Sequence, residues 1–255
     1  MRSLDWRDVQ QAIDGLTFVK RIAYYPSLPS TNLLAKALIR DASSTGTVVV
    51  ADDQTQGRGR LGRSWLVPPF SGLTFSLCLA LDRQLPVRAL TPAAALAVRD
   101  VVRALVGPRC AVKWPNDVLV DGLKVAGILI ELVDTTAAVI GIGVNVGAAP
   151  DLPTATSLTA ATGRSLDREP LFIDLLHALD ARLVVAARSP SALMEEWRSS
   201  LSMLGRRVRA RTPVETVEGV ALDVDADGSL VVRLDDGQIR SLPAADLVLP
   251  PSDPA

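Results

Sequence analysis

Histidine and cysteine are scarce in this chain of 255 residues, which holds one histidine and two cysteines. A zinc site draws mainly on these residues, and a serine or cysteine nucleophile needs a histidine base, so the composition argues against both kinds of site. His177 lies in a helical pattern and is interpreted as structural. Cys78 and Cys110 lie in apolar, strand-like runs, which predicts reduced core thiols in a cytoplasmic protein.

Long apolar runs and an excess of positive charge are also missing. No run approaches the length of a transmembrane helix, and the N-terminus has no signal-peptide pattern. The formal net charge is −1, whereas a general nucleic-acid or membrane-surface binder would carry a basic excess. The sequence therefore predicts a globular protein with neither DNA nor a membrane as its partner.

Glycine and arginine, by contrast, are concentrated in one stretch, residues 57–65, which reads Gly-Arg-Gly-Arg-Leu-Gly-Arg-Ser-Trp. Glycines allow a ligand to approach the backbone amides closely, and the arginines add planar, permanently charged groups suited to phosphate or carboxylate. We call this stretch the arginine loop and predict that it holds an anion. The alternative is a flexible, solvated turn with incidental charge.

The glycine spacing of the arginine loop also fits the dinucleotide-binding fingerprint. That fingerprint requires a strand before it and a helix directly behind it. A strand-like run does precede, at residues 47–51, but Pro68 and Pro69 prevent a helix from following. This context excludes the dinucleotide-binding interpretation.

Two further polar groups lie outside the arginine loop. Ser30, Thr31 and Asn32 precede the helical run 33–39, so they are either N-capping residues or a group that binds a polar ligand. Residues 113–117 read Lys-Trp-Pro-Asn-Asp, a turn that can bind a metal or ribose or serve only as a turn. Lys124 begins an otherwise apolar strand, where a lysine usually extends into solvent.

The element pattern predicts an α+β fold with a largely antiparallel sheet and helices on one face. Strands are expected at 47–51, 72–81, 111–114, 118–120, 124–133 and 137–146. Helices are expected at 4–14, 33–39, 91–105, 168–187 and 191–204. Short strands at 208–211, 215–222, 229–234 and 238–242, separated by Asp-Gly turns, predict a small barrel. The predicted domains are therefore 1–204 and 205–250, with a disordered tail at 251–255.

Taken in order along the chain, these motifs resemble the biotin protein ligase family. The resemblance covers roughly residues 25–250 and depends on the arginine loop and the Lys-Trp-Pro-Asn-Asp motif, with Lys124–Ile128 and the Gly-Ile-Gly-Val-Asn run 141–145 behind them. Lipoate ligases share the fold but lack this arginine loop, so they match less well. The resemblance implies a class II synthetase-like ligase domain followed by an SH3-like barrel.

The resemblance further implies an ATP- and Mg²⁺-dependent reaction in two steps. Biotin is activated to biotinyl-5′-AMP and then transferred to a lysine of the biotin carboxyl carrier domain of an acyl-CoA or pyruvate carboxylase. Some family members carry an N-terminal winged-helix domain that represses transcription. Only about 24 residues precede the turn at Pro26, so a ligase that is not a repressor is expected, as a monomer or weak homodimer.

Roles for individual residues also follow from the resemblance. The expected biotin-binding residues are Ser30, Thr31, Asn32, Gln54, Arg58, Gly59, Arg60, Lys124, Gly127 and Ile128. The expected nucleotide-binding residues are Gly57, Arg58, Arg60, Arg63, Trp65, Lys113, Asn116, Asp117 and Asn145. Lys124 and Arg60 would be the catalytic cations, and Asp117 is a candidate contact for the magnesium of MgATP. Trp65 and Trp114 either line the site or are core tryptophans.

Two alternative functions remain open at this point. A lipoate or octanoate ligase of the same fold would differ in the acid that it activates. A catalytically inactive relative would bind a small molecule without turnover. Loss of turnover would be expected to remove Arg60 or Lys124, and both are present.

Overall fold

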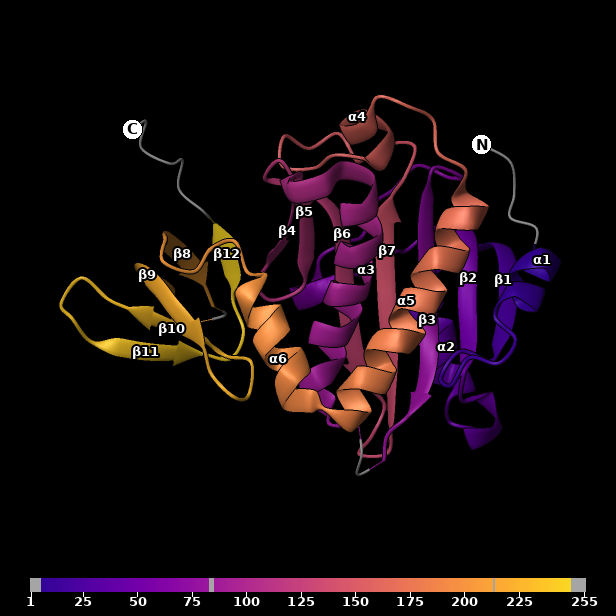
Figure 1. Ribbon diagram of the computed structural model, residues 1–255, viewed down its shortest axis with the longest axis horizontal. Coiled ribbons are helices and arrows are strands. Elements are labelled where there is room, and N and C mark those ends of the chain that lie inside the picture. The colour runs from indigo at the N-terminus through magenta and orange to yellow at the C-terminus, as the bar shows by residue number, and fades with distance from the viewer. Residues whose placement is uncertain (1–5, 83–84, 213, 249–255) are drawn as a thin grey trace.

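The computed structural model describes residues 6–82, 85–212 and 214–248, which form two sheets and the helices around them (Figure 1). The larger sheet has seven strands, in the order β1-β2-β3-β7-β6-β5-β4. They are β1 Arg21–Leu28, β2 Thr47–Gln54, β3 Gly72–Ala80, β4 Cys110–Lys113, β5 Asp117–Val120, β6 Leu123–Leu132 and β7 Ala137–Asn145. The β1–β2 pair is parallel and the other pairs are antiparallel, which confirms the predicted largely antiparallel sheet.

Six α-helices accompany the strands in the described residues. They are α1 Trp6–Ala12, α2 Thr31–Leu38, α3 Leu90–Val106, α4 Leu158–Thr162, α5 Arg168–Arg188 and α6 Pro190–Ser199. Short 3₁₀ turns lie at η1 Ala42–Ser44, η2 Arg60–Gly62, η3 Val87–Ala89 and η4 Gly107–Arg109. The predicted helices 33–39, 91–105 and 168–187 are present with shifted ends, whereas the short helix α4 was not predicted. The predicted helix 4–14 is present as α1, and its first two residues lie outside the described residues.

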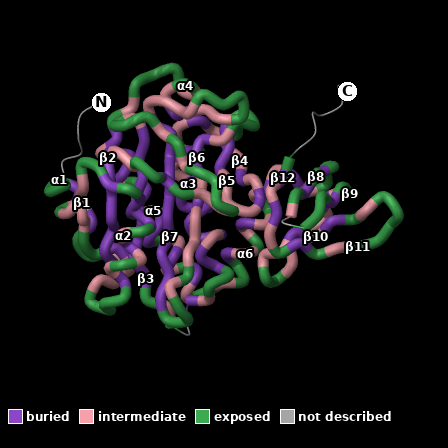
Figure 2. The backbone as a smooth tube through the Cα atoms, turned by 180° about the vertical axis from the view of Figure 1, so that it is seen from behind, coloured by how far each residue is buried: buried purple, intermediate pink, exposed green. Residues whose placement is uncertain are grey.

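Helices cover both faces of the large sheet, so the prediction that they lie on one face is wrong for α2. Along β2, Val48 and Val50 join the core beneath α3 and α5. Val49 and Ala51 point the other way and pack with Ala35 of α2. Because the side chains of a strand alternate between faces, a strand that is apolar at consecutive positions needs a cover on each side. Figure 2 shows how completely these central strands are buried.

Helix α6 ends at Ser199, five residues before the predicted end of this helix at 204. The hydroxyl of Ser200 donates to the carbonyl of Trp197 at the end of the helix. The chain then turns away, and the backbone N–H of Ser202 donates to the carbonyl of Val112 in β4. Residues 200–204 therefore leave the helix because they pair with the edge of the large sheet.

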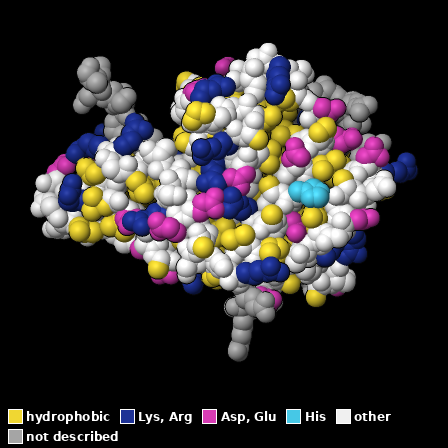
Figure 3. All heavy atoms as spheres, viewed as in Figure 1, with side chains coloured by type: hydrophobic (Ala, Val, Ile, Leu, Met, Phe, Trp, Pro, Cys, Tyr) yellow, Lys and Arg dark blue, Asp and Glu magenta, His cyan; other side chains and the backbone are white. Residues whose placement is uncertain are grey.

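A cluster of ion pairs joins α6 to α3 and α5 at the surface (Figure 3). Arg99 lies 2.6 Å from Glu196, and Arg182 bridges Glu196 and Asp100 at 2.5 Å from each. A network of this kind fixes the three helices relative to one another more firmly than isolated surface pairs, which contribute little.

The smaller sheet has five strands, in the order β11-β10-β9-β8-β12, with antiparallel pairs throughout. They are β8 Arg207–Arg211, β9 Thr216–Val224, β10 Leu230–Arg233, β11 Ile239–Leu242 and β12 Asp246–Val248. Four of these strands were predicted, and β12 was not. The predicted tail 251–255 lies outside the described residues.

The residues that the sequence set aside as structural behave accordingly. Cys78 and Cys110 are free and buried, and burial raises the pKa of each thiol to about 11. His177 lies on an exposed face of α5, with its Nε2 2.9 Å from the carbonyl of Ala12 at the end of α1. Among the described residues, no helix is long and apolar enough to cross a membrane.

Candidate functional site

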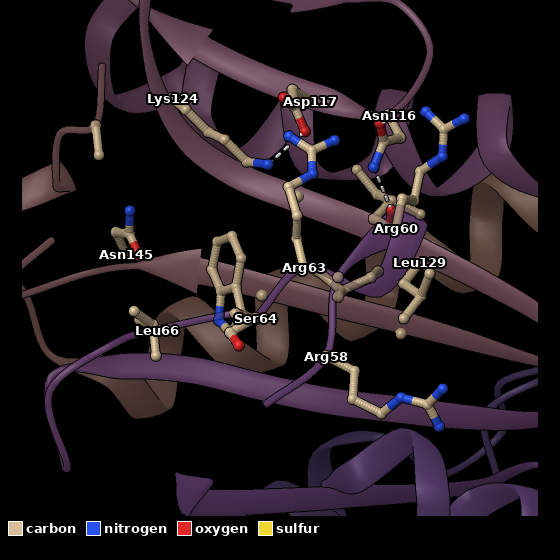
Figure 4. A pocket seen from close by; sticks show the side chains of 18 of the residues that line it. Arg58, Arg60, Arg63, Ser64, Leu66, Asn116, Asp117, Lys124, Leu129 and Asn145 are labelled. Carbon is tan, nitrogen blue, oxygen red and sulfur yellow. Dashed lines mark hydrogen bonds and ion pairs between the residues drawn. The ribbon is translucent and has the colours of Figure 1, made fainter. Parts of the chain in front are cut away.

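A cavity of about 460 Å³ opens on the face of the large sheet that carries α2. It lies over β3, β7 and β6, beside the N-terminus of α2, and the arginine loop and the 113–117 turn border it (Figure 4). Further walls come from residues 150–155 and from Asp246–Val248 of the small sheet. The cavity thus collects segments that are far apart in the sequence.

Glycines in two neighbouring strands make room for this cavity. A Cβ atom on Gly141 of β7 would lie 2.0 Å from Oδ1 of Asn32, and one on Gly143 would lie 2.3 Å from Cε2 of Trp65. On β6, a Cβ atom on Gly127 would lie 3.2 Å from Trp65. These positions point to the same face because side chains two apart on a strand share a face. The Gly-Ile-Gly run is therefore a floor on which other side chains rest.

A group of hydrogen-bonded polar side chains forms one end of the cavity. Ser30 is the N-cap residue of α2, but its side chain makes no capping hydrogen bond. Thr31 and Asn32 lie inside the first turn, and the backbone N–H and hydroxyl of Thr31 both meet Oε1 of Gln54, at 2.7 and 3.0 Å. Asn32 donates to Glu131 at 2.9 Å. Capping therefore does not account for these side chains, whereas the ligand-binding interpretation fits their position.

The opposite end of the cavity is cationic. Nζ of Lys124 lies 2.6 Å from Oδ1 of Asp117 and 5.5 Å from the centre of the Trp65 ring. Arg60 donates to Oδ1 of Asn116 at 3.2 Å. Burial lowers the pKa of Arg60 and of Lys113, despite nearby carboxylates that act in the opposite sense. Cations held with little solvent attract an anion far more strongly than they would in water.

A β-bulge explains why Lys124 does not extend into solvent. In the β5–β6 pair, Val118 faces Ala126, whereas the next residue, Leu119, faces Lys124. Val125 is therefore an extra residue in β6, and both Val125 and Ala126 are buried in the core on the α3 side. A bulge redirects the side chains that flank it. It turns Lys124 toward the cavity, where it lies on the same face as Gly127.

The arginine loop closes on itself as a narrow hairpin. The N–H of Trp65 donates to the carbonyl of Gly57 at 2.9 Å, and the N–H of Gly59 donates to the carbonyl of Arg63 at 2.7 Å. A Cβ atom on Gly57 would lie 2.3 Å from the carbonyl oxygen of Trp65, so glycine is needed for this close approach. The loop therefore has defined backbone pairing, unlike the flexible turn considered as the alternative.

The three arginines of the loop point in different directions. Arg60 reaches Asn116 at the cationic end, whereas Arg58 points away from it (Figure 4). Arg58 lies 3.8 Å from Glu131, beside the polar end of the cavity. Arg63 pairs with Asp246 of the small sheet. The sequence-predicted residues therefore all lie in one region, but the three arginines do not form a single cluster.

Both tryptophans line the cavity, and Trp114 is also a core residue. It is 1% exposed, and its indole N–H donates to the carbonyl of Gly228 at 2.9 Å, which joins the large sheet to the β9–β10 turn. Trp65 is partly exposed and lies over Lys124. Trp114 thus both lines the site and belongs to the core, which were the two alternatives for the tryptophans.

Most of the sequence-predicted site residues line this cavity, and some residues in or beneath it were missed. Of the biotin- and nucleotide-binding sets, all except Gly57 line it. Among the missed residues, Asp246 lines the cavity, whereas Ser76 and Glu131 lie beneath its polar end. Ser76 and Glu131 interrupt apolar strands, a weak signal that could have drawn attention to them. Asp246 carries no such signal, because only the docking of the small sheet brings it to the cavity.

No protein-held metal centre is evident at the cavity. The described residues contain no cluster of three or more histidine, cysteine, aspartate or glutamate side chains that could hold a metal ion. Asp117 is already paired with Lys124, while Oδ1 of Asn145 is buried without a hydrogen-bond partner. Either side chain offers an oxygen to a magnesium ion that arrives with the phosphates of a nucleotide, because Mg²⁺ in such sites takes few protein ligands.

The known proteins and protein families that this chain resembles in sequence are ligases of one kind. Residues 24–145 match the biotin/lipoate A/B protein ligase family, and residues 203–249 match the biotin protein ligase C-terminal domain. The chain is 36% identical over 230 residues to the biotin–[acetyl-CoA-carboxylase] ligase of Mycobacterium tuberculosis, which covers 86% of this chain and 85% of that protein. It is 35% identical to the bifunctional ligase/repressor BirA of Bacillus subtilis, with 90% and 74% covered.

A solved structure has the same fold. The biotin protein ligase from Aquifex aeolicus, in complex with biotin and ATP, matches with a TM-score of 0.76 at 27% identity, covering 91% of this chain and 99% of that one. The match confirms the predicted mixed α+β fold with a small C-terminal sheet.

Proposed function

Since this chain belongs to the biotin/lipoate A/B protein ligase family, we propose that it is an ATP-dependent biotin protein ligase. It joins the carboxylate of biotin to the α-phosphate of ATP, and it then transfers the biotinyl group to a lysine amine. The observation that carries the proposal is a single cavity that joins a hydrogen-bonding end to a cationic end. Biotin has a polar ring at one end and a carboxylate at the other, so it matches both.

In the first step, the carboxylate oxygen of biotin forms a bond to the α-phosphorus and pyrophosphate leaves. Both reactants are anions, so their mutual repulsion opposes the approach. Lys124 and Arg60 lie where they reduce this repulsion, and Asp117 and Trp65 hold Lys124 in place. Fixed cations of this kind stabilise the developing charge without reorganisation, and no enzyme nucleophile is required.

The proposed binding roles follow the two ends of the cavity. The polar end, with Ser30, Thr31, Asn32 and Gln54, takes the biotin ring, and Gly127 and Ile128 wall it. The nucleotide occupies the cationic end, beside Lys113, Asn116, Asp117, Asn145 and Trp65. Magnesium enters with ATP and supplies charge neutralisation at the phosphates. Arg58 and Arg63, from the loop that Gly57 and Gly59 shape, serve the phosphate and carboxylate.

In the second step, a lysine amine attacks the acyl carbon of biotinyl-5′-AMP. A C–N bond forms, the bond from the acyl carbon to the phosphate oxygen breaks, and AMP leaves as the amine loses a proton. The cations that favoured adenylate formation also stabilise the departing phosphate. We propose that the amine belongs to a carrier domain of an acyl-CoA or pyruvate carboxylase in the cytoplasm. Residues 1–204 would act as the ligase domain and 205–250 as a separate small domain.

A lipoate or octanoate ligase is the alternative within the same family. A dithiolane ring or an alkyl chain offers no hydrogen-bonding groups to the polar end of the cavity. Buried polar groups left without partners cost about 1–3 kcal/mol each, so the cavity favours biotin over these acids.

Pyrophosphate release with MgATP tests the proposal when biotin, lipoate and octanoate are compared as the acid. We expect release with biotin and only a background rate with the other two. Faster release with lipoate or octanoate would assign the chain to the alternative. The absence of release with every acid would favour an inactive, ligand-binding relative.

A further inference from the structure

A chain of hydrogen-bonded side chains runs beneath the polar end of the cavity, from Glu131 to Gln54. Asn32 donates to Glu131 at 2.9 Å, and its Oδ1 lies 2.6 Å from the hydroxyl of Ser76. The same Ser76 hydroxyl is 2.7 Å from that of Thr31, which is 3.0 Å from Oε1 of Gln54. Asn32, Thr31 and Ser76 are all at most 4% exposed. Water therefore contributes little to satisfying these groups.

Glu131 sets the orientation of Asn32. Burial favours the neutral acid, but hydrogen bonds from Asn32 and Lys36 outweigh it and leave the pKa of Glu131 below its usual range. Lys36 lies 3.0 Å from the carboxylate and Arg58 lies 3.8 Å from it. An ionised carboxylate only accepts hydrogen bonds, so Asn32 must turn its amide nitrogen toward Glu131. Its carbonyl oxygen then faces Ser76.

With Asn32 in this orientation, the series of hydrogen-bonded side chains has too few protons. Three oxygen–oxygen contacts link Asn32 to Ser76, Ser76 to Thr31 and Thr31 to Gln54, but only the two hydroxyl protons are present to fill them. The Gln54 oxygen is fixed toward Thr31 because it also accepts the backbone N–H of Thr31 at 2.7 Å. One of these three contacts therefore has no proton between its two oxygen atoms, and their lone pairs face each other. Thr31 and Gln54 line the cavity, so a ligand can supply the missing donor there.

We propose that Glu131, acting through Asn32 and Ser76, makes this end of the cavity select an acid whose head group carries an N–H donor. The inference rests on the proposed function, since the cyclic urea of biotin has such donors and a dithiolane or an alkyl chain has none. Glu131 is a positioning residue that does not itself line the cavity. With glutamine at this position, the new carboxamide can donate to Asn32, so only the 3.4 Å contact between the Asn32 amide nitrogen and the carbonyl of Leu129 opposes a reversal. After the reversal, the amide nitrogen of Asn32 donates to Ser76 and supplies the missing proton.

Calorimetric titration of biotin and of biotin methylated at both ureido nitrogens tests this selection. The wild-type protein, Glu131→Gln and Glu218→Gln are compared; Glu218 is an exposed glutamate of the small sheet, paired with Arg209. We expect Glu131→Gln to bind biotin about tenfold more weakly and to lose most of the preference over the methylated analogue. Glu218→Gln should match the wild type.

Ser76→Ala provides a second, smaller change with the same expected loss of preference, and it decides the matter where Glu131→Gln does not fold. Wild-type affinity and preference in both variants would overturn the inference while leaving the proposed function intact. A wild-type protein that binds no biotin would overturn both.

Discussion

Replacing Lys124 with alanine is expected to slow pyrophosphate release from biotin and MgATP by about a hundredfold to a thousandfold. Lys124 is held at the cationic end of the cavity, 2.6 Å from Asp117. Its charge is needed most when carboxylate and phosphate meet, so kcat and kcat/KM should fall together. Steady-state pyrophosphate release at varied biotin and ATP, with a biotin-accepting carrier domain present to discharge the bound adenylate, measures both quantities.

Lys20→Ala is the matched control for this change, since Lys20 is an exposed lysine far from the cavity residues. Its rate should equal that of the wild type. A Lys124→Ala protein that keeps its kcat and loses only affinity would indicate that the lysine binds the substrates equally in the ground and transition states, and that Arg60 or another group supplies the catalytic charge.

Replacing Gly143 with valine is expected to weaken the binding of biotin and of its adenylate by about a hundredfold or more, because the added side chain fills the floor of the cavity and displaces Trp65, and about 3 kcal/mol of lost binding free energy gives such a factor. Even the first added carbon would lie 2.3 Å from Cε2 and 2.6 Å from Nε1 of Trp65. The indole is rigid, so it must move away from its place over Lys124. Calorimetric titration with biotin, and with a non-hydrolysable adenylate analogue, gives the two affinities.

The stability of this variant separates blocking of the cavity from general damage. Gly143 points toward the cavity, so the melting temperature of Gly143→Val should lie within a few degrees of the wild-type value. Ala80→Val makes a similar addition at an exposed position of the same sheet and should bind biotin normally. Normal biotin affinity in Gly143→Val would show that Trp65 does not need its position in the empty cavity.

Much of the fold could be predicted from the sequence because the signals were local. The apolar stripe of α3 and the Asp-Gly turns of the small sheet are set by residues a few positions apart. The face on which α2 packs could not be predicted, since consecutive valines in β2 do not say which cover lies on which side. Likewise, the end of α6 depends on Ser202 pairing with Val112, a contact between distant segments.

The candidate site shows the same division between local and distant determinants. The arginine loop and Lys124 could be recognised because charged residues stand next to glycines or begin an apolar strand. The inward direction of Lys124 could not, because it depends on the bulge at Val125. The role of Glu131 depends on α2, because this helix places Asn32 and Lys36 against its carboxylate. Single residues whose role depends on packing leave little trace in the sequence.

The most direct measurement is the identification of the small molecule that remains on the protein after incubation with biotin and MgATP in the absence of any carrier domain. Gel filtration followed by mass spectrometry of the released ligand suffices. The account predicts biotinyl-5′-AMP in near-stoichiometric amount, dependent on both substrates and formed about a hundredfold to a thousandfold more slowly by Lys124→Ala. Recovery of unreacted biotin and ATP from a protein that binds both would contradict the claim that this cavity joins carboxylate to phosphate.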